Sequence, residues 1–191
     1  MIELPTFAVP GSFAASFIDA GFTQSAMQSD DYIPRKGGRY SVGFTFGPYT
    51  PDEGRVMVSR LIAGKQGGLR VRLPLLHSQG SPGNPTVAFA SGRVLSLAGL
   101  TANYPALEGF WLSITANGRS YLHSIGVGAT ADGGGSVEVE LNELLRDTIP
   151  VGSAVNLAAP VVEGLVQGDE ASWNASVNRV IPIEFSIKER R

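Results

Sequence analysis

The second half of this sequence consists of short segments in which apolar and polar residues alternate, separated by glycine-containing turns. Six such segments can be read in order: TVAFA, RVLSLAG, GFWLSIT, RSYLHSIGV, SVEVEL and AVNLAAP. Alternation with a period of two turns one face of a strand to the core and the other outward. Short strands that recur about every ten residues between turn signals are typical of a small antiparallel β-sandwich or barrel.

The glycine-rich run IGVGATADGGGSVEVEL, residues 125–141, raises the question of a phosphate site. Such a site needs a helix directly after the glycines, because backbone N–H groups and the helix dipole bind the anion. Here Val137, Val139 and Leu141 alternate with glutamates instead, which indicates a strand. We therefore expect residues 131–136 to form an exposed turn between antiparallel strands.

A second pattern links the two ends of the chain. Val42, Phe44 and Phe46 alternate with small residues, and residues 181–187 alternate in the same way. The segment GLRVRLPLL, residues 68–76, has the same character. We expect residues 42–46 and 181–187 to lie in one outer sheet, although Pro182 within the last segment is tolerated only at an edge or at a strand start.

One convincing helix is predicted, over residues 51–63. Thr50 is a favourable N-cap, Pro51 suits the first helical position, and Glu53 completes a capping box. Gly64 is expected to end this helix. A short helical turn is also expected in LNELLRDTI, residues 141–149.

Together these patterns predict a mainly β protein, all-β with one or two short helices. Its outer split β domain, residues 41–84 plus 163–191, carries the helix, and residues 85–162 form an inserted antiparallel β-sandwich or barrel module. Residues 1–40 are rich in glycine, serine and paired acids, and we interpret them as an N-terminal arm or long loop with at most one short strand.

Composition excludes several classes of function. The chain of 191 residues has a net charge of −2, which gives no electrostatic field for binding nucleic acid. It contains no cysteine, so disulfides, thiolate metal sites and a cysteine nucleophile are excluded. The N-terminus lacks the basic region of a signal peptide, and no apolar run reaches the length of a membrane span.

Residues that could carry catalysis are few. Of the two histidines, His77 lies in a polar connection and His123 in the strand segment SYLHSI, where Leu122 occupies the opposite face. The acidic pair Asp30 and Asp31 is interpreted as a solvated turn. We therefore predict no catalytic, cofactor-binding or metal-binding residue, no cofactor and no enzymatic activity. A hydrolase whose carboxylates meet only in the folded protein stays an open alternative.

The segment VSRLIAGKQGGLRVRLPLL, residues 58–76, resembles the helix–glycine–strand segment of siphophage minor tail proteins of the distal-tail type. The stretches YLHSI, ADGGGSVEVEL and LLRDTIPVGSAV are similar to a β module that recurs in tailed-phage structural proteins. The segment VVEGLVQGDEASWNASVNRVIPIEFSIKE resembles the end of the same family. The resemblance extends from Arg39 to the C-terminus.

This resemblance implies a non-enzymatic virion protein of the phage tail, made in the host bacterial cytoplasm. Such a subunit forms a homo-oligomeric ring that joins the tail tube to the tail tip or receptor-binding apparatus. Six-fold symmetry is expected, and a three-fold tip is the alternative. Another hub or tube subunit of the tail tip is a further alternative. A host-surface carbohydrate-binding protein is the other alternative, with Trp111, Tyr121 or Trp173 stacking on sugar.

Overall fold

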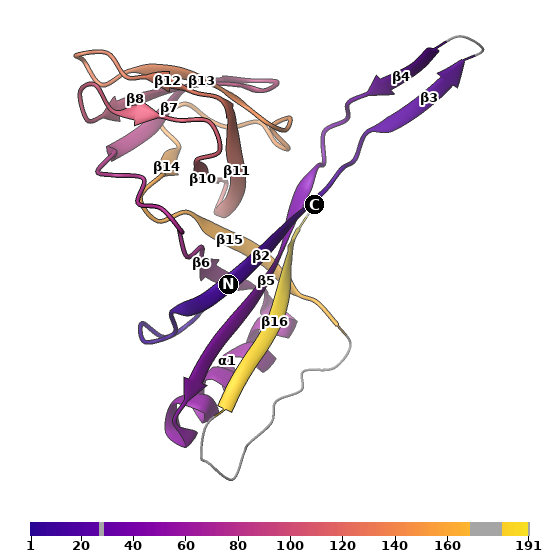
Figure 1. Cartoon of the computed structure of the whole chain (residues 1–191), viewed down its shortest axis with the longest axis vertical. Coiled ribbons are helices and arrows are strands. Elements are labelled where there is room, and N and C mark those ends of the chain that lie inside the picture. The colour runs from indigo at the N-terminus through magenta and orange to yellow at the C-terminus, as the bar shows by residue number, and fades with distance from the viewer. Residues whose placement is uncertain (27–28, 169–180, 191) are drawn as a thin grey trace.

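The computed structural model describes residues 1–26, 29–168 and 181–190. In this part of the chain the protein is mainly β with one α-helix, which confirms the predicted fold class. Figure 1 shows three parts: a long twisted sheet with the helix beside it, a compact barrel above one end of that sheet, and a narrow hairpin that projects away from both.

The large sheet combines strands from the beginning, the first half and the end of the chain. Its order is β1 (Ile2–Glu3), β6 (Leu69–Arg72), β15 (Val161–Val166), β16 (Ile181–Glu189), β5 (Arg39–Tyr49) and β2 (Pro10–Ile18). Neighbouring strands are antiparallel except β1 and β6, which are parallel.

The pairing of β5 with β16 confirms the predicted outer sheet. Val42 lies opposite Ile187, and Phe44 lies opposite Phe185. The rings of Phe46 and Phe185 stack with their centroids 5.3 Å apart. These apolar side chains therefore join two segments that are distant in the sequence through one core.

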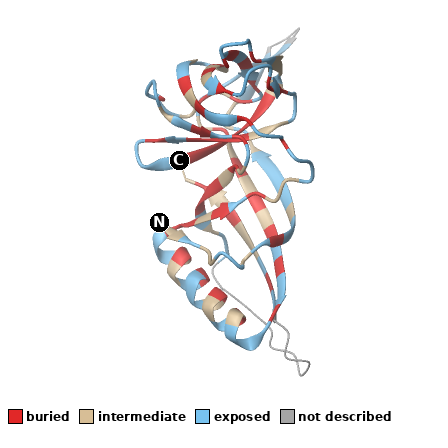
Figure 2. Ribbon diagram, turned by 90° about the vertical axis from the view of Figure 1, so that its left-hand side faces the viewer, coloured by how far each residue is buried: buried red, intermediate tan, exposed pale blue. Residues whose placement is uncertain are grey.

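The helix α1 (Pro51–Gly67) packs along this sheet and turns its buried residues inward (Figure 2). Its predicted capping box is confirmed, since the Thr50 side chain accepts from the Glu53 N–H and Glu53 reaches back to the Thr50 N–H. The expected end at Gly64 is wrong, because the helix continues to Gly67. A Cβ at Gly64 would lie 3.0 Å from the Leu69 side chain, so this glycine allows close packing of helix and sheet.

The barrel is closed and contains only strands from the middle of the chain. Its order is β10 (Trp111–Ala116), β11 (Arg119–Val127), β13 (Val137–Leu141), β8 (Val94–Leu100), β7 (Gly83–Ser91) and β14 (Ala154–Asn156). Closure pairs β14 with both β10 and β7. Of the two architectures expected for this region, the structure shows the barrel.

The glycine-rich run is a turn, and β13 rather than a helix follows it. Asp132 stabilises the turn, because its Oδ1 accepts from the N–H groups of Gly134 and Ser136, each at 2.8 Å. Strand β11 ends at Val127 and β13 begins at Val137, and the two strands are antiparallel, as expected for this connection. Between β11 and β13 the chain forms β12 (Ala129–Thr130), which pairs with β9 (Pro105–Ala106).

The expectation of a long loop with at most one short strand over residues 1–40 is wrong, although part of this region does project from the body as an arm (Figure 1). Strands β1 and β2 belong to the large sheet, and β3 (Phe22–Ala26) with β4 (Ser29–Ile33) forms the projecting hairpin. The helical turn expected over residues 141–149 is also wrong. Leu145 donates its N–H to the Gly92 carbonyl, and Leu145 and Ile149 are buried in the barrel core. Tertiary packing outweighs local helix propensity there.

Candidate functional site

The barrel meets the large sheet along β11. The contact forms at the edge of β11 where part of the strand has no neighbouring strand among those described. Strand β13 pairs with β11 only at Ile125 and Val127, so the first half of β11 has no strand on that side. The N–H groups on this buried edge are instead satisfied by carboxylates of the sheet. The N–H of Ser120 donates to Glu163, and the N–H of Leu122 donates to Glu189. Buried backbone donors need such partners, so the junction is fully compensated at these two positions.

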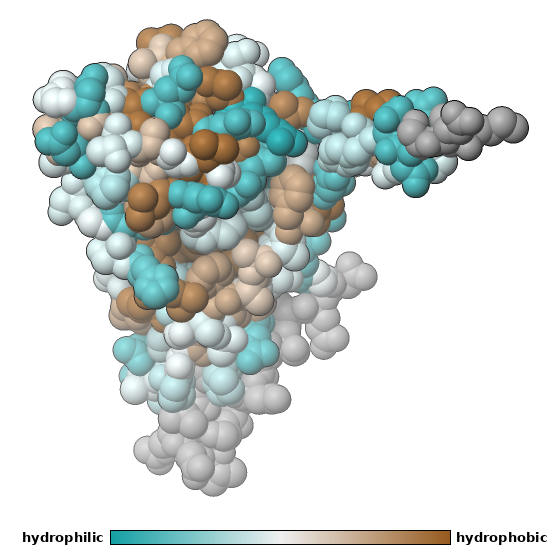
Figure 3. Space-filling view, turned by 45° about the horizontal axis from the view of Figure 1, so that its top comes forward, coloured by the Kyte–Doolittle hydropathy of each residue, from teal (hydrophilic) through white to brown (hydrophobic). Residues whose placement is uncertain are grey.

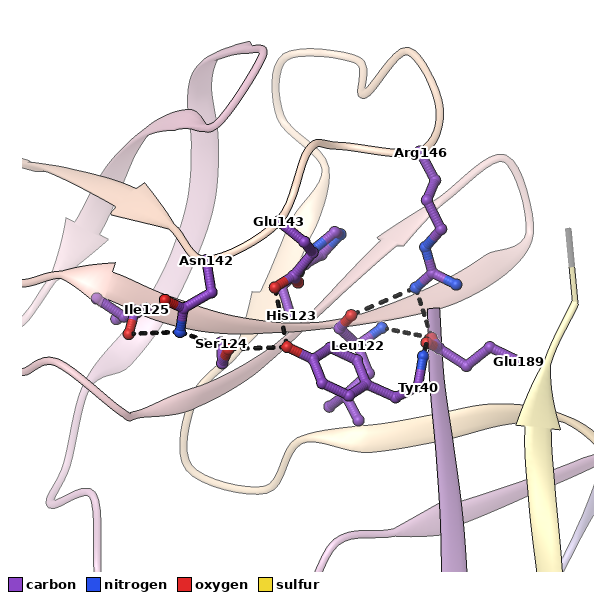
Figure 4. A network of polar contacts seen from close by, with 9 residues as sticks. All are labelled: Tyr40, Leu122, His123, Ser124, Ile125, Asn142, Glu143, Arg146 and Glu189. Atoms are coloured by element: carbon purple, nitrogen blue, oxygen red, sulfur yellow. Dashed lines mark hydrogen bonds and ion pairs between the residues drawn. The ribbon is translucent and has the colours of Figure 1, made fainter. Parts of the chain in front are cut away.

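Glu189 connects three separate parts of the chain (Figure 4). Its Oε1 accepts from the Leu122 N–H at 2.8 Å and from the Arg146 guanidinium at 2.6 Å. Its Oε2 accepts from the N–H of Tyr40 at 2.8 Å. Glu189 is only 2% exposed. One buried carboxylate therefore binds the end of β16, the start of β5 and the barrel together.

A second buried carboxylate, Glu163 on β15, acts in the same way. Arg70 on β6 donates to its Oε2 through Nε at 3.1 Å and Nη2 at 2.6 Å, and the Ser120 N–H donates to the same oxygen at 3.2 Å. Arg70 also lies 3.4 Å from Glu3. The positive charge of Arg70 is thus balanced within its own sheet.

The third part of the junction surrounds His123 on β11 (Figure 4). Its Nδ1 lies 2.6 Å from Glu143 Oε1, and the hydroxyl of Tyr40 donates to Glu143 Oε2 at 2.9 Å. The same hydroxyl lies 2.9 Å from Ser124 Oγ. Burial raises the pKa of the Tyr40 phenol well above its usual range, and the negative charge of Glu143 raises that pKa further.

A histidine beside a glutamate can serve as a general base, but this pair is enclosed. His123 is fully buried and Glu143 is 4% exposed. No hydrogen-bond partner for His123 Nε2 is found in the described part of the chain. A substrate could reach these atoms only if barrel and sheet separated. The arrangement is therefore suited to fixing two modules in one orientation.

The residues singled out from the sequence lie in different places. His77 is exposed, and Asp30 and Asp31 lie on β4 rather than in a loop. Within residues 1–26, 29–168 and 181–190, no cluster of three metal-ligating side chains is found.

Two of the three aromatic residues considered for sugar stacking are covered. Trp111 is half-buried, with its ring edge-on to Tyr40 at 5.0 Å between centroids. Tyr121 is 7% exposed and donates its hydroxyl to Asp147. Trp173 lies outside the described residues. No described aromatic of this set therefore offers an open face for sugar.

Sequence reasoning missed the carboxylates of the junction, although a signal for two of them was present. Glu189 follows Ile183, Phe185 and Ile187 in the same alternating phase, so its position predicts burial. Glu163 interrupts an otherwise apolar run. A charge in phase with a buried face indicates a buried ion pair. Glu143 and Arg146 carry no such signal, because they follow β13 in irregular backbone.

The β3–β4 hairpin is the second candidate site. Unlike the buried junction, it is exposed. Strand β3 pairs only with β4 among the described strands. Phe22, Tyr32 and Ile33 are 39%, 50% and 36% exposed. Figure 3 shows the hairpin standing clear of the body, with hydrophobic side chains on its surface. Apolar residues gathered on an element without further packing indicate a surface for another molecule.

No protein-family model matches this chain, and no curated protein matches its sequence. Among the described residues, no helix has both the length and the apolar character that a membrane crossing requires. The geometry of the junction and the hairpin is therefore the basis for a functional proposal.

Proposed function

We propose that this protein is a structural subunit of a phage tail that acts by assembling into a ring, six-fold in symmetry, between the tail tube and the tail tip. The resemblance from Arg39 onward supports the phage assignment. The observation that carries the assembly is the projecting β3–β4 hairpin with its exposed aromatic and aliphatic residues. In this proposal the protein is part of the virion, where neighbouring copies cover the surface of the hairpin.

An isolated two-stranded hairpin is at best marginally stable in water. The described contacts of this hairpin are mainly within itself and with the segments at its base: the Tyr32 hydroxyl donates to Asp19 at 2.6 Å, and the Arg35 guanidinium lies 4.3 Å from the Phe22 ring centroid. These exposed contacts contribute little. A second surface that packs against the hairpin accounts for its extended form and its apolar residues.

The outer edge of the large sheet also favours assembly. Strand β2 pairs with β5 on one side and with no other described strand on the other side. An uncovered edge presents unpaired N–H and C=O groups that a neighbouring chain can use. If this edge or the hairpin of one copy binds a different surface of the next copy, the contact is heterologous. Heterologous contacts generate a ring when the rotation between copies closes.

The buried junction gives this proposal its geometry. Glu163 and Glu189 hold the barrel to the sheet, so the body behaves as one unit and the hairpin leaves it in a defined direction. A ring of fixed size requires a constant angle between the two surfaces through which each copy contacts its neighbours. A chain with two loosely linked modules would give assemblies of mixed size.

The test is the mass of the purified protein in solution, by sedimentation velocity and by native mass spectrometry. We expect a closed particle with six times the mass of the 20.1 kDa chain, visible as a ring in negative-stain images. The matched variant replaces residues 19–38 with Asn-Gly, which joins β2 directly to β5 because Ile18 already pairs with Arg39. This variant should stay folded and monomeric. A wild-type chain that is monomeric at all concentrations would overturn the proposal.

A further inference from the structure

A groove with a volume of about 770 Å³ lies beside β1 and β6, and Figure 1 shows the hairpin projecting away from these strands. The turn after β1, strand β6 and the segment after β6 form its walls. Its apolar wall includes Leu4, Val9 and Leu75, of which Val9 is 70% exposed. Leu4 and Leu75 also pack against the core of the large sheet, whereas Val9 is open to solvent. An exposed apolar side chain in a concave site favours a ligand or partner that covers it.

One guanidinium of this groove has no ion pair among the described residues. Arg70 lies in ion pairs with Glu163 and Glu3. Arg72, on the same face of β6, is exposed and has no ion pair within residues 1–26, 29–168 and 181–190. A carboxylate is the group that a free guanidinium in such a position binds best.

The groove also borders a free strand edge. Strand β1 pairs with β6 only at Leu69 and Arg70. Beyond that point, at Val71 and Arg72, no described strand continues the sheet on this side. An added extended segment can therefore form backbone hydrogen bonds there while its side chains enter the groove.

The hairpin has a face that is complementary to this groove. The register places Phe22 opposite Ile33 and Gln24 opposite Asp31, so these four side chains share one face of the ribbon. Residues 19–33 contain three aspartates, and the basic residues Arg35 and Lys36 follow at the base of the hairpin, where the Arg35 guanidinium lies 4.3 Å from the centroid of the Phe22 ring. The Asp31 side chain has no ion pair or hydrogen bond among the described residues, whereas the side chains of Asp19 and Asp30 have partners within the hairpin.

We propose that the hairpin of one copy docks into the groove of a second copy, head to tail, with Asp31 paired to Arg72. Phe22 and Ile33 then pack on the apolar wall of the groove. This inference rests on the proposed function and identifies the surfaces that form the ring contact. A second copy is required, because the hairpin projects away from β1 and β6, beside which the groove lies (Figure 1).

Charge reversal tests the pairing in the full-length protein. Asp31→Arg and Arg72→Asp should each raise the dissociation constant of the assembly by more than about tenfold, because like charges would then meet across the contact. The double variant Asp31→Arg/Arg72→Asp should regain assembly, since each contact again contains one residue of each sign. Arg60→Asp is the matched control: Arg60 is exposed on α1, away from both surfaces.

Crosslinking gives a second readout that does not depend on affinity. The chain has no cysteine, so Asp31→Cys and Arg72→Cys each introduce a single thiol. Mixed under oxidising conditions, the two variants should form a disulfide-linked heterodimer, identified by mass spectrometry. Arg60→Cys mixed with Asp31→Cys should form none above background.

The outcomes separate this inference from the proposed function. Rings that form equally well in the wild type and in both charge reversals would overturn the docking and leave the ring assignment in place. Links only between two Asp31→Cys chains would show a symmetric contact and would also overturn it. A wild type that never assembles would overturn both. Loss of assembly in each single variant, with recovery in the double variant, supports it.

Discussion

The barrel–sheet junction and the β3–β4 hairpin both contain strand edges without a neighbouring strand in the described part of the chain, but the two edges differ in what covers them. In the junction, the free edge of β11 is closed by Glu163 and Glu189 of the same chain. In the hairpin, exposed apolar residues and the unpaired Asp31 have no such cover within the described chain. The first edge is completed by folding, and in our proposal the second is completed by assembly.

This difference indicates which substitutions should affect folding and which should affect association. A buried carboxylate whose partner is removed leaves an uncompensated charge in a medium of low dielectric constant. An exposed carboxylate in the hairpin is solvated in the monomer and matters only when a partner covers it. The comparison is therefore testable by matched substitutions in the two regions, with unfolding measured under conditions in which the chain is monomeric.

The largest effect is expected for Glu189→Ala. It removes the carboxylate that accepts from the Arg146 guanidinium and from the N–H groups of Tyr40 and Leu122, and Arg146 keeps its hydrogen bond to the Leu122 carbonyl. Loss of one partner of a buried ion pair costs about 3–5 kcal/mol, measured as the free energy of unfolding in urea. Asp31→Ala is the matched control and should leave the urea midpoint unchanged. Glu189→Gln should lie between the two, and equal midpoints for all variants would contradict the role of this junction.

A smaller loss is expected for Tyr40→Phe. The substitution keeps the ring that packs on Trp111 but removes the hydroxyl that donates to Glu143 and contacts Ser124. A hydrogen bond to a charged group contributes about 1.5–3 kcal/mol, and Glu143 keeps His123 as its remaining partner. Urea unfolding should show this decrease. A gain in stability would mean that desolvation of Glu143 outweighs the bond.

Tyr40 should also make stability depend on alkaline pH. Its folded-state pKa is raised, first by burial and then by the charge of Glu143. The stability contribution is therefore complete below the unfolded-state pKa of about 10 and is lost as pH rises above it, because the unfolded chain ionises first. Burial also raises the pKa of Tyr49, Tyr104 and Tyr121.

Urea midpoints across this pH range test the assignment. The midpoint of the wild type should fall as pH rises from about 9 to about 11, and that of Tyr40→Phe should fall less steeply. The other four tyrosines contribute to the remaining slope, because the hydrogen bond to Asp19 raises the pKa of Tyr32 as well. Parallel curves for the two proteins would show that Tyr40 is ionised equally in both states.

Sequence patterns were informative where a strand or helix carries its own signal. The alternation of Val42, Phe44 and Phe46 and the capping box at Thr50 predict β5 and the start of α1 because both signals are local. Strand β2 was missed because alanine and serine separate Phe13 from Phe17, a spacing that a helix would share. Its strand conformation comes from pairing with β5, a contact distant in sequence.

The site was harder to predict than the fold, for the same reason. His123 has no acidic neighbour in the sequence, and Glu143 reaches it only because the chain returns after β13 to the same end of the barrel. Tyr40 joins them from the other module. A lone histidine thus becomes part of a network through three segments whose proximity exists only in the folded chain.

The smallest effect is expected for Tyr32→Phe, which is chemically the same change as Tyr40→Phe. Tyr32 donates to Asp19 at 2.6 Å, but it is 50% exposed, so water replaces the lost bond and the urea midpoint should not move. The register places Tyr32 opposite Thr23, on the face of the ribbon away from Asp31. Sedimentation should therefore show the same particle as the wild type. Dissociation caused by Tyr32→Phe alone would mean that the opposite face of the hairpin carries the contact, and the assignment of Asp31 to Arg72 would fail.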